Sequence, residues 1–147
     1  MPSLRRVITR LRDPRDLLLF LKIILMLIRL PGQIRRQRLP SLLLKLDPGV
    51  PHEHMSEAKL IKTVGFVDTL LRYRIFQRYG KCLLRSLILF RFLRLQGWPV
   101  EIHFGVRKDL KDTNKITGHS WLVLNSQPFL ENEDQQGSYS TTYSYSG

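Results

Sequence analysis

The sequence predicts an α+β fold, with helices in the first two thirds of the chain and a small antiparallel sheet after them. Apolar residues recur at helical spacing up to residue 96, whereas alternation with a period of two begins at Val100. Gly97 separates the two patterns, and glycine is typical of the residue that follows a helix. The 147 residues, of which 43% are hydrophobic and 24% charged, suffice for one domain with a sizeable core.

The first predicted helix covers residues 17–30, with Asp16 as its N-cap and an end at Pro31 and Gly32. It is apolar nearly all round, and Lys22 interrupts an apolar run that is too short to cross a bilayer. We expect such a helix to be buried in the core, and binding along a membrane surface is the alternative.

The formal net charge of +12 is concentrated in residues 1–45, where Asp13 and Asp16 are the only acids. The basic residues of this segment are Arg5, Arg6, Arg10, Arg12, Arg15, Lys22, Arg29, Arg35, Arg36, Arg38 and Lys45. Such a segment attracts nucleic acid, an anionic membrane or an acidic protein segment. No stacking aromatics, zinc finger or RNA-binding motif accompany it, so we expect no nucleic-acid partner.

Two more helices are predicted after a proline-rich connector at residues 31–54, which has room for about one helical turn. Ser56 begins the helix over residues 57–73. The helix over residues 81–96 follows Gly80, and its apolar side chains leave little polar surface. We therefore expect the helix over 81–96 to lie at the centre of the domain.

The predicted sheet contains strands at residues 100–107 and 119–124. Residues 125–128 turn the chain, and residues 129–132 return it alongside the second strand. The strands and the helices before them predict a core domain over residues 55–134, preceded by a basic helical region with its connector at 1–54. The tail over residues 135–147 has no aliphatic side chain, so we expect it to be disordered and dispensable.

A single cysteine, Cys82, excludes an intrachain disulfide and a cysteine-based zinc site. No signal peptide is evident, which favours the cytoplasm. Cys82 lies in the first turn of the helix over residues 81–96, where backbone N–H groups and the helix dipole stabilise a thiolate. A lone cysteine is more often a small apolar residue, so position alone does not make it a nucleophile.

His119, at the start of the second strand, is the best candidate for a general base. A thiolate at a helix start with a histidine on a neighbouring strand is the arrangement of thiol proteases. His52 and His54 lie in the connector, and His103 lies in the middle of the first strand, so all three are weaker candidates.

A third group that orients His119 can come from three positions, depending on the strand register. A two-residue turn at Asn125 and Ser126 places Asn132 opposite His119. A turn shifted by one residue places Asp134 there, and a bulge places Glu131 there.

Four motifs together resemble those of a known family. They are Cys82-Leu83-Leu84-Arg85-Ser86-Leu87, Leu93-Arg94-Leu95-Gln96-Gly97, Phe104-Gly105-Val106-Arg107 and Gly118-His119-Ser120-Trp121-Leu122-Val123. The set resembles the leader-peptide-cleaving cysteine protease of bacterial lasso-peptide biosynthesis, which belongs to the transglutaminase-like, papain-related superfamily. The resemblance covers about residues 57–132 and, more loosely, the apolar N-terminal helix. It implies a papain/transglutaminase-like core, whose Cys-bearing helix packs on the sheet.

The resemblance also implies roles for individual residues. Cys82 matches the nucleophile of the family and His119 its base, while Glu131 matches the acid best by offset, followed by Asn132. The backbone N–H of Cys82 and one further donor, for which Gln77 is a candidate, would stabilise the oxyanion. Arg85, one turn after Cys82, would support the thiolate or bind an internal carboxylate.

The partners that the resemblance implies are a ribosomally made precursor peptide, a separate leader-binding protein and a cyclase that closes the lasso ring. The chain is too short for the protease and a fused leader-binding domain, so we expect a stand-alone subunit that docks its partner through residues 1–45. ATP stimulation is associated with the family, but no Gly-x-x-x-x-Gly-Lys loop is present, so we expect no cofactor and no metal.

Two other functions fit the same residues. An acyl transferase would use the same thiolate and imidazole but pass the acyl group to an amine instead of water. A basic protein without enzymatic activity would bind membranes or acidic partners and leave Cys82 inert.

Overall fold

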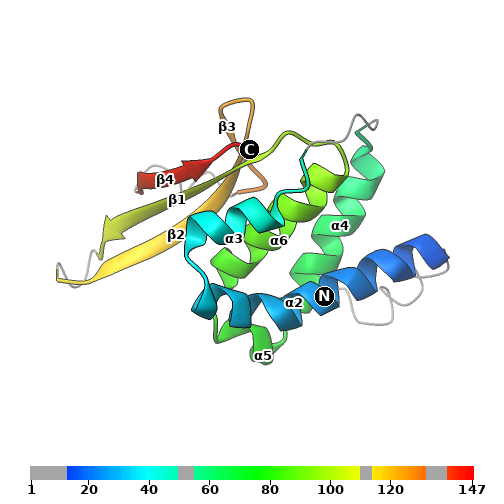
Figure 1. The fold of residues 1–147 in the computed structure, drawn as a ribbon, viewed down its shortest axis with the longest axis horizontal. Helices are drawn as coiled ribbons and strands as arrows, with labels where there is room; N and C mark the ends of the chain where they lie inside the picture. The colour runs from blue at the N-terminus through cyan, green and yellow to red at the C-terminus, as the bar shows by residue number, and fades with distance from the viewer. Residues whose placement is uncertain (1–12, 50–54, 110–113, 132–138) are drawn as a thin grey trace.

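The computed structural model describes residues 13–49, 55–109, 114–131 and 139–147. Five helices precede the strands within these residues: α2 (Pro14–Arg36), α3 (Leu39–Leu46), α4 (Glu57–Leu70), α5 (Arg74–Gln77) and α6 (Lys81–Leu95). The strands are β1 (Glu101–Lys108), β2 (Ile116–Leu124), β3 (Gln127–Phe129) and β4 (Ser140–Tyr145), in the antiparallel order β3-β2-β1-β4 (Figure 1). The predicted α+β class, with a small antiparallel sheet after the helices, is confirmed.

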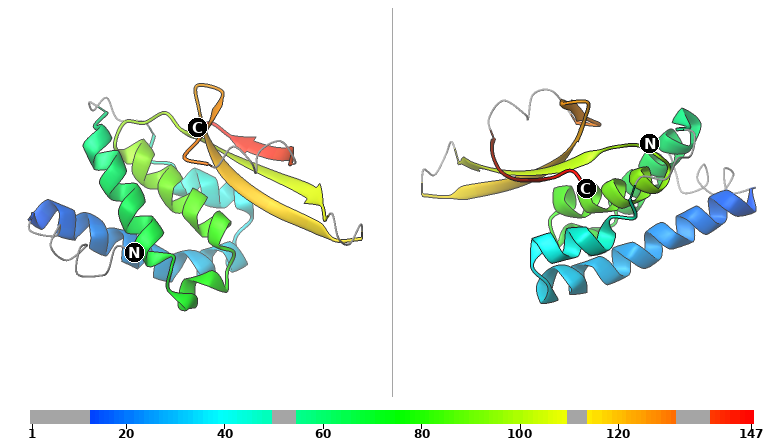
Figure 2. Two further views of the ribbon diagram at one scale, coloured as in Figure 1. Left: turned by 180° about the vertical axis from the view of Figure 1, so that it is seen from behind. Right: turned by 45° about the horizontal axis from the view of Figure 1, so that its top comes forward.

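Helix α6 lies at the centre of the fold. Nine of its residues between Leu84 and Arg94 are buried, because helices α2, α3 and α4 pack on one side and strands β1 and β2 on the other (Figures 1 and 2). Gly97 ends the helix with a φ of 86°, and the N–H groups of Gly97 and Trp98 donate to Arg94 O and Leu93 O, both at 3.0 Å. This is the Schellman arrangement that glycine permits, and it matches the predicted helix end.

Helix α2 is longer than predicted. It begins after Asp13, whose side chain accepts a hydrogen bond from Arg15 N, and it continues through Pro31 to Arg36. Proline removes one hydrogen bond from a helix and usually ends or kinks it. Here Pro31 is itself buried beside Leu27 and Leu30, so packing against the core offsets the lost bond.

Because α2 has 23 residues, the expectation that this segment is too short to cross a bilayer is wrong. Helix α2 is long and apolar enough to cross a membrane by length and composition, although core helices of soluble proteins meet the same criterion. One face of α2, with Ile23, Leu27 and Leu30 at 0% exposure, belongs to the same core cluster as α6. The core therefore includes residues from both sides of the predicted boundary at residue 54.

Helix α3 forms within the proline-rich connector and is two turns long. Pro40 stands in its first turn, where proline is tolerated because the first N–H groups of a helix have no internal partner. Leu42, Leu43 and Leu46 are buried against the core. Apolar side chains at this spacing account for a helix longer than the single turn expected.

The prediction of a disordered tail is wrong for residues 139–147. Residues Ser140–Tyr145 form strand β4, which pairs with β1 in antiparallel register. Aromatic side chains replace the missing aliphatic ones: Tyr145 meets Phe90 edge to face at 5.8 Å, and Tyr143 lies 6.0 Å from Phe104. Residues 135–138 lie outside the described part of the chain.

Arg94 connects the end of the chain to the core. This side chain is 5% exposed, and its Nε donates to Asp47 Oδ1 at 2.8 Å while its Nη1 donates to Ser146 O at 2.9 Å. The Tyr145 hydroxyl donates to Asp47 Oδ2 at 3.1 Å. Burial, followed by this bond to Asp47, raises the pKa of Tyr145 above its ordinary value of 10.0.

We expect a chain that ends at Asp134 to be less stable than the full chain, by about 2 kcal/mol or more, because Arg94 and Asp47 each lose a partner. Chemical unfolding measures the difference. Tyr145→Phe is the milder variant and should cost about 1 kcal/mol. Because the folded state raises the Tyr145 pKa, its contribution is complete below pH 10 and should fall as the pH rises further. Equal unfolding midpoints for the truncated and full chains would contradict the role assigned to β4.

Candidate active site

Cys82 lies in the first turn of α6, as predicted. Gly80 precedes the helix with a φ of 82°, which favours glycine, and no side chain caps the helix start. The first N–H groups of α6 therefore keep their capacity to bind an anion near the Cys82 sulfur. Cys82 is partly exposed and lines an open pocket of about 680 Å³ between α4, α6 and the edge of the sheet.

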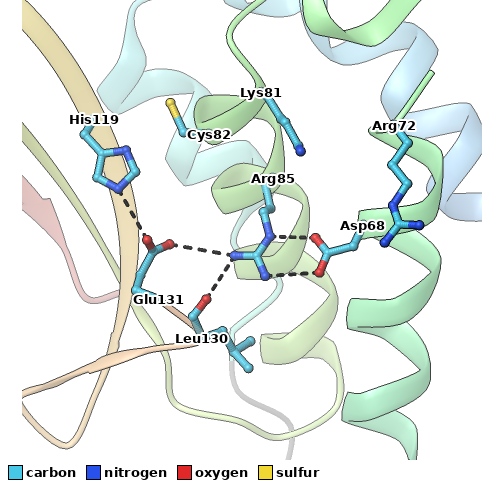
Figure 3. Close-up of a pocket in the computed structure, with 8 residues that line it drawn as sticks. All are labelled: Asp68, Arg72, Lys81, Cys82, Arg85, His119, Leu130 and Glu131. Atoms are coloured by element: carbon cyan, nitrogen blue, oxygen red, sulfur yellow. Dashed lines mark hydrogen bonds and ion pairs between the residues drawn. The ribbon is translucent and has the colours of Figure 1, made fainter. Parts of the chain in front are cut away.

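His119 lines the same pocket from strand β2. Its Nε2 lies 3.3 Å from Oε2 of Glu131, and both side chains are largely buried, with 13% and 11% exposed. Figure 3 shows that the other ring nitrogen, Nδ1, is turned toward the Cys82 side of the pocket. Cysteine, histidine and carboxylate thus stand in the order that a thiol hydrolase requires.

The carboxylate determines which nitrogen of His119 carries the proton. An ionised Glu131 can only accept a hydrogen bond, so the proton of a neutral imidazole is held on Nε2. The lone pair is then on Nδ1, which faces Cys82. This tautomer is the one that can take the thiol proton.

The hairpin that carries Glu131 follows one of the registers open from the sequence. Asn125 and Ser126 form the two-residue turn, with φ values of 51° and 62°, and Leu124 pairs with Gln127. The ladder ends at Phe129, and Leu130 takes a φ of 61° that turns the backbone out of the strand. This turn of the backbone at Leu130 brings Glu131 to His119, which is the effect that was expected from a bulge. Asn132 and Asp134 lie outside the described residues.

Arg85 fixes the position of Glu131. Its Nε and Nη2 donate to the two oxygens of Asp68 on α4, at 2.7 and 3.3 Å. Its Nη1 donates to Leu130 O at 3.2 Å and lies 3.7 Å from Oε1 of Glu131 (Figure 3). Arg85 thus binds an internal carboxylate, and it holds both the turn at Leu130 and the carboxylate that follows it.

A buried serine joins the cysteine helix to the histidine strand. Ser86, one turn after Cys82, is 2% exposed and donates to Ser120 O at 2.9 Å. Because Ser120 follows His119 directly, this bond fixes the position of the histidine along α6. The sequence shows a hydroxyl side chain within a mainly apolar helix, but it does not show which group that hydroxyl bonds.

Aromatic side chains hold the ring of His119 from the sheet side. Trp121 stacks on it at 5.8 Å and 19°, and Tyr139 lies 5.0 Å away. Gly105 leaves room for this arrangement, since a Cβ there would come within 2.8 Å of the Trp121 ring. Tyr139 belongs to the tail that was expected to be disordered, so sequence reasoning missed its contact with the site.

A family model for the transglutaminase-like superfamily matches residues 24–144. The chain belongs to this superfamily. Its members are typically cysteine proteases or acyltransferases, which places the chain among enzymes of the cysteine-peptidase type. Comparisons with curated proteins and with solved structures gave no match.

The transglutaminase-like match begins within α2 and ends within β4, so it extends on both sides of residues 57–132. Within the described ranges, no group of three or more His, Cys, Asp or Glu side chains is placed to hold a metal ion. His103 stands on β1 and pairs with Glu101 at 3.1 Å, and it is not among the residues that line the pocket. His52 and His54 lie outside the described residues, as does the side chain of Gln77.

The transglutaminase-like arrangement predicts a reactive thiol at Cys82. Iodoacetamide should label it faster than free cysteine at neutral pH, and His119→Ala should slow labelling by about tenfold because the thiolate loses its partner. His103→Ala is a matched control, since it removes a strand histidine that also pairs with a glutamate. Equal labelling of the two variants would contradict the pairing of Cys82 with His119.

We expect Arg85→Met to lower the reactivity of Cys82 by about tenfold to a hundredfold, because Glu131 and the turn at Leu130 lose their support. Arg91→Met, on the same helix but outside this pocket, should leave the reactivity unchanged. Labelling rates measured across pH separate the two variants, and circular dichroism checks that both are folded. A labelling profile for Arg85→Met that matches the unmodified chain would show that Glu131 does not need the arginine.

Proposed function

We propose that this protein is a cysteine protease that removes the leader from a ribosomally made lasso-peptide precursor. The observation that carries the proposal is the contact of His119 Nε2 with Glu131, which leaves Nδ1 as the base toward Cys82. The resemblance of the four motifs to the leader-cleaving proteases supports the choice of substrate.

The reaction begins with transfer of the Cys82 proton to His119 Nδ1. The thiolate attacks the carbonyl carbon at the junction between leader and core, and the C=O electron pair moves to oxygen. The backbone N–H of Cys82, at the start of α6 that no side chain caps, would donate to that oxyanion together with one further donor. Glu131 stabilises the imidazolium that forms.

Collapse of the intermediate breaks the C–N bond. His119 gives its proton to the leaving amine, which becomes the amino terminus of the core peptide, and the leader stays bound to Cys82 as a thioester. Water then attacks the thioester carbonyl and gives its proton to His119. The C–S bond breaks, the leader leaves as a carboxylic acid, and His119 returns the proton to the Cys82 sulfur. The open pocket beside Cys82 gives water and an extended peptide access to the sulfur.

The protease is proposed to work with a separate leader-binding protein and to supply a cyclase with the free core peptide. Substrate recognition through a partner raises the effective concentration of the precursor at Cys82 to about the millimolar range. The chain supplies the nucleophile and the base, and the partner protein would supply most of the binding to the leader.

The test is mass spectrometry of a synthetic precursor incubated with the full chain, with and without the leader-binding protein. We expect one cut that adds the mass of water, faster by about a hundredfold or more with the partner. Cys82→Ala should abolish cleavage, and Glu131→Gln should lower kcat by about a hundredfold because the amide can stabilise the wrong imidazole tautomer.

Other outcomes would overturn the proposal. A new amide bond to an added amine, without hydrolysis, would make the protein an acyl transferase. Full-rate, specific cleavage by the isolated chain would remove the need for a partner. A precursor left intact with the partner present, by a folded protein whose Cys82 is reactive, would contradict the assigned substrate.

A further inference from the structure

Helix α2 presents a second apolar face that no described residue covers. Its members, which we call the α2 stripe, are exposed by 43–64% and recur at helical spacing. The α2 stripe consists of Leu17, Leu18, Leu21, Leu25 and Ile28. The opposite face, with Ile23, Leu27 and Leu30, is fully buried, so the stripe is additional to the face that packs on the core.

A groove rich in cations lies beside the α2 stripe. This basic groove, of about 520 Å³, is lined by Lys22 and Arg29 of α2, Lys45 of α3 and Arg91 of α6, and no carboxylate is among its lining residues. Leu25 belongs both to the α2 stripe and to the groove, so the apolar and the positive surfaces are continuous.

The acids of α2 do not neutralise this surface. Asp16 is paired with Lys62 of α4 at 2.6 Å, at the other end of α2 from the basic pair Arg35 and Arg36. Figures 1 and 2 show α2 along the edge of the molecule, on the side of α6 away from the sheet. A straight helix at an edge can lie flat against an extended surface.

We propose that the α2 stripe and the basic groove bind the surface of an anionic membrane, with α2 lying in the plane of the interface. Aliphatic side chains enter the acyl boundary, and lysines and arginines pair with lipid phosphates, which is the chemistry of interfacial helices. The α2 stripe contains only leucine and isoleucine, whereas the hot spots of protein interfaces are enriched in Trp, Tyr and Arg. Its composition therefore favours lipid over a protein partner.

With α2 in the plane of the membrane interface the core stays intact, whereas it would not if α2 crossed the bilayer. Crossing a bilayer would separate Ile23, Leu27 and Leu30 from the core, because these side chains pack with α4 and α6. Lying in the interface uses only the exposed face and needs no unpacking. The catalytic pocket shares no lining residue with the basic groove, so a membrane-bound molecule keeps Cys82 accessible.

The test is flotation of the full chain with vesicles of phosphatidylcholine alone or of phosphatidylcholine mixed with phosphatidylglycerol. We expect binding to the mixed vesicles, weakened by salt, and little binding to phosphatidylcholine alone. The combined variant Leu21→Gln, Leu25→Gln and Ile28→Gln should lower the partition coefficient by about tenfold or more. Lys22→Gln with Arg29→Gln should lower it by about thirtyfold.

Matched controls are Ile116→Gln, an exposed isoleucine of β2, and Lys59→Gln, an exposed lysine of α4, both of which should bind as the unmodified chain does.

Absence of binding to the mixed vesicles would overturn the proposal. The proposal would also be overturned if the Lys22→Gln, Arg29→Gln variant lost binding while the Leu21→Gln, Leu25→Gln, Ile28→Gln variant kept it, because any basic protein adheres to anionic lipid in that way. Two other results would assign the surface to another occupant. One is self-association that the variant with glutamine at positions 21, 25 and 28 abolishes, and the other is an acidic protein that displaces the vesicles from the α2 stripe. Lipid partitioning does not involve cleavage, so its failure leaves the proposed protease function standing.

Discussion

The burial of helix α6 is the constraint on which the rest of the structure depends. A helix with leucine, isoleucine and phenylalanine on all sides must be enclosed, and α2, α3, α4, β1 and β2 provide the enclosure. Its first turn stays partly accessible, and that turn carries Cys82. The same burial that stabilises the domain therefore leaves the nucleophile at the start of the helix, beside the histidine strand.

The motif around Cys82 combines three functions on adjacent faces of one helix. Cys82 faces the pocket, Arg85 reaches across to Asp68 and Glu131, and Ser86 is bonded to the backbone beside His119. Two of these residues thus set the position of groups on other elements. Spacing by three and four residues makes this possible, because such residues lie one turn apart on a helix.

Much of this arrangement was predictable from local signals. The cysteine helix, its end at Gly97 and the histidine strand follow from periodicity and from turn residues. The position of Glu131 did not, because it depends on a positive φ at Leu130 that Arg85 supports from a distant part of the chain. The tail was predicted to be disordered and the first helix was predicted to end at Pro31, and both predictions rested on local sequence. Long-range packing on Arg94, Phe90 and the core outweighs these local signals.

The tight hairpin between β2 and β3 has a consequence for how the chain can vary. Side chains alternate across a strand, so one residue inserted at Asn125 or Ser126 would move the segment before Glu131 to the opposite face and take the carboxylate away from His119. The described residues of the connection between β1 and β2, 109 and 114–115, are not among those that line the pocket. Length variation among related chains should therefore concentrate in that connection, while the number of residues from His119 to Glu131 stays constant.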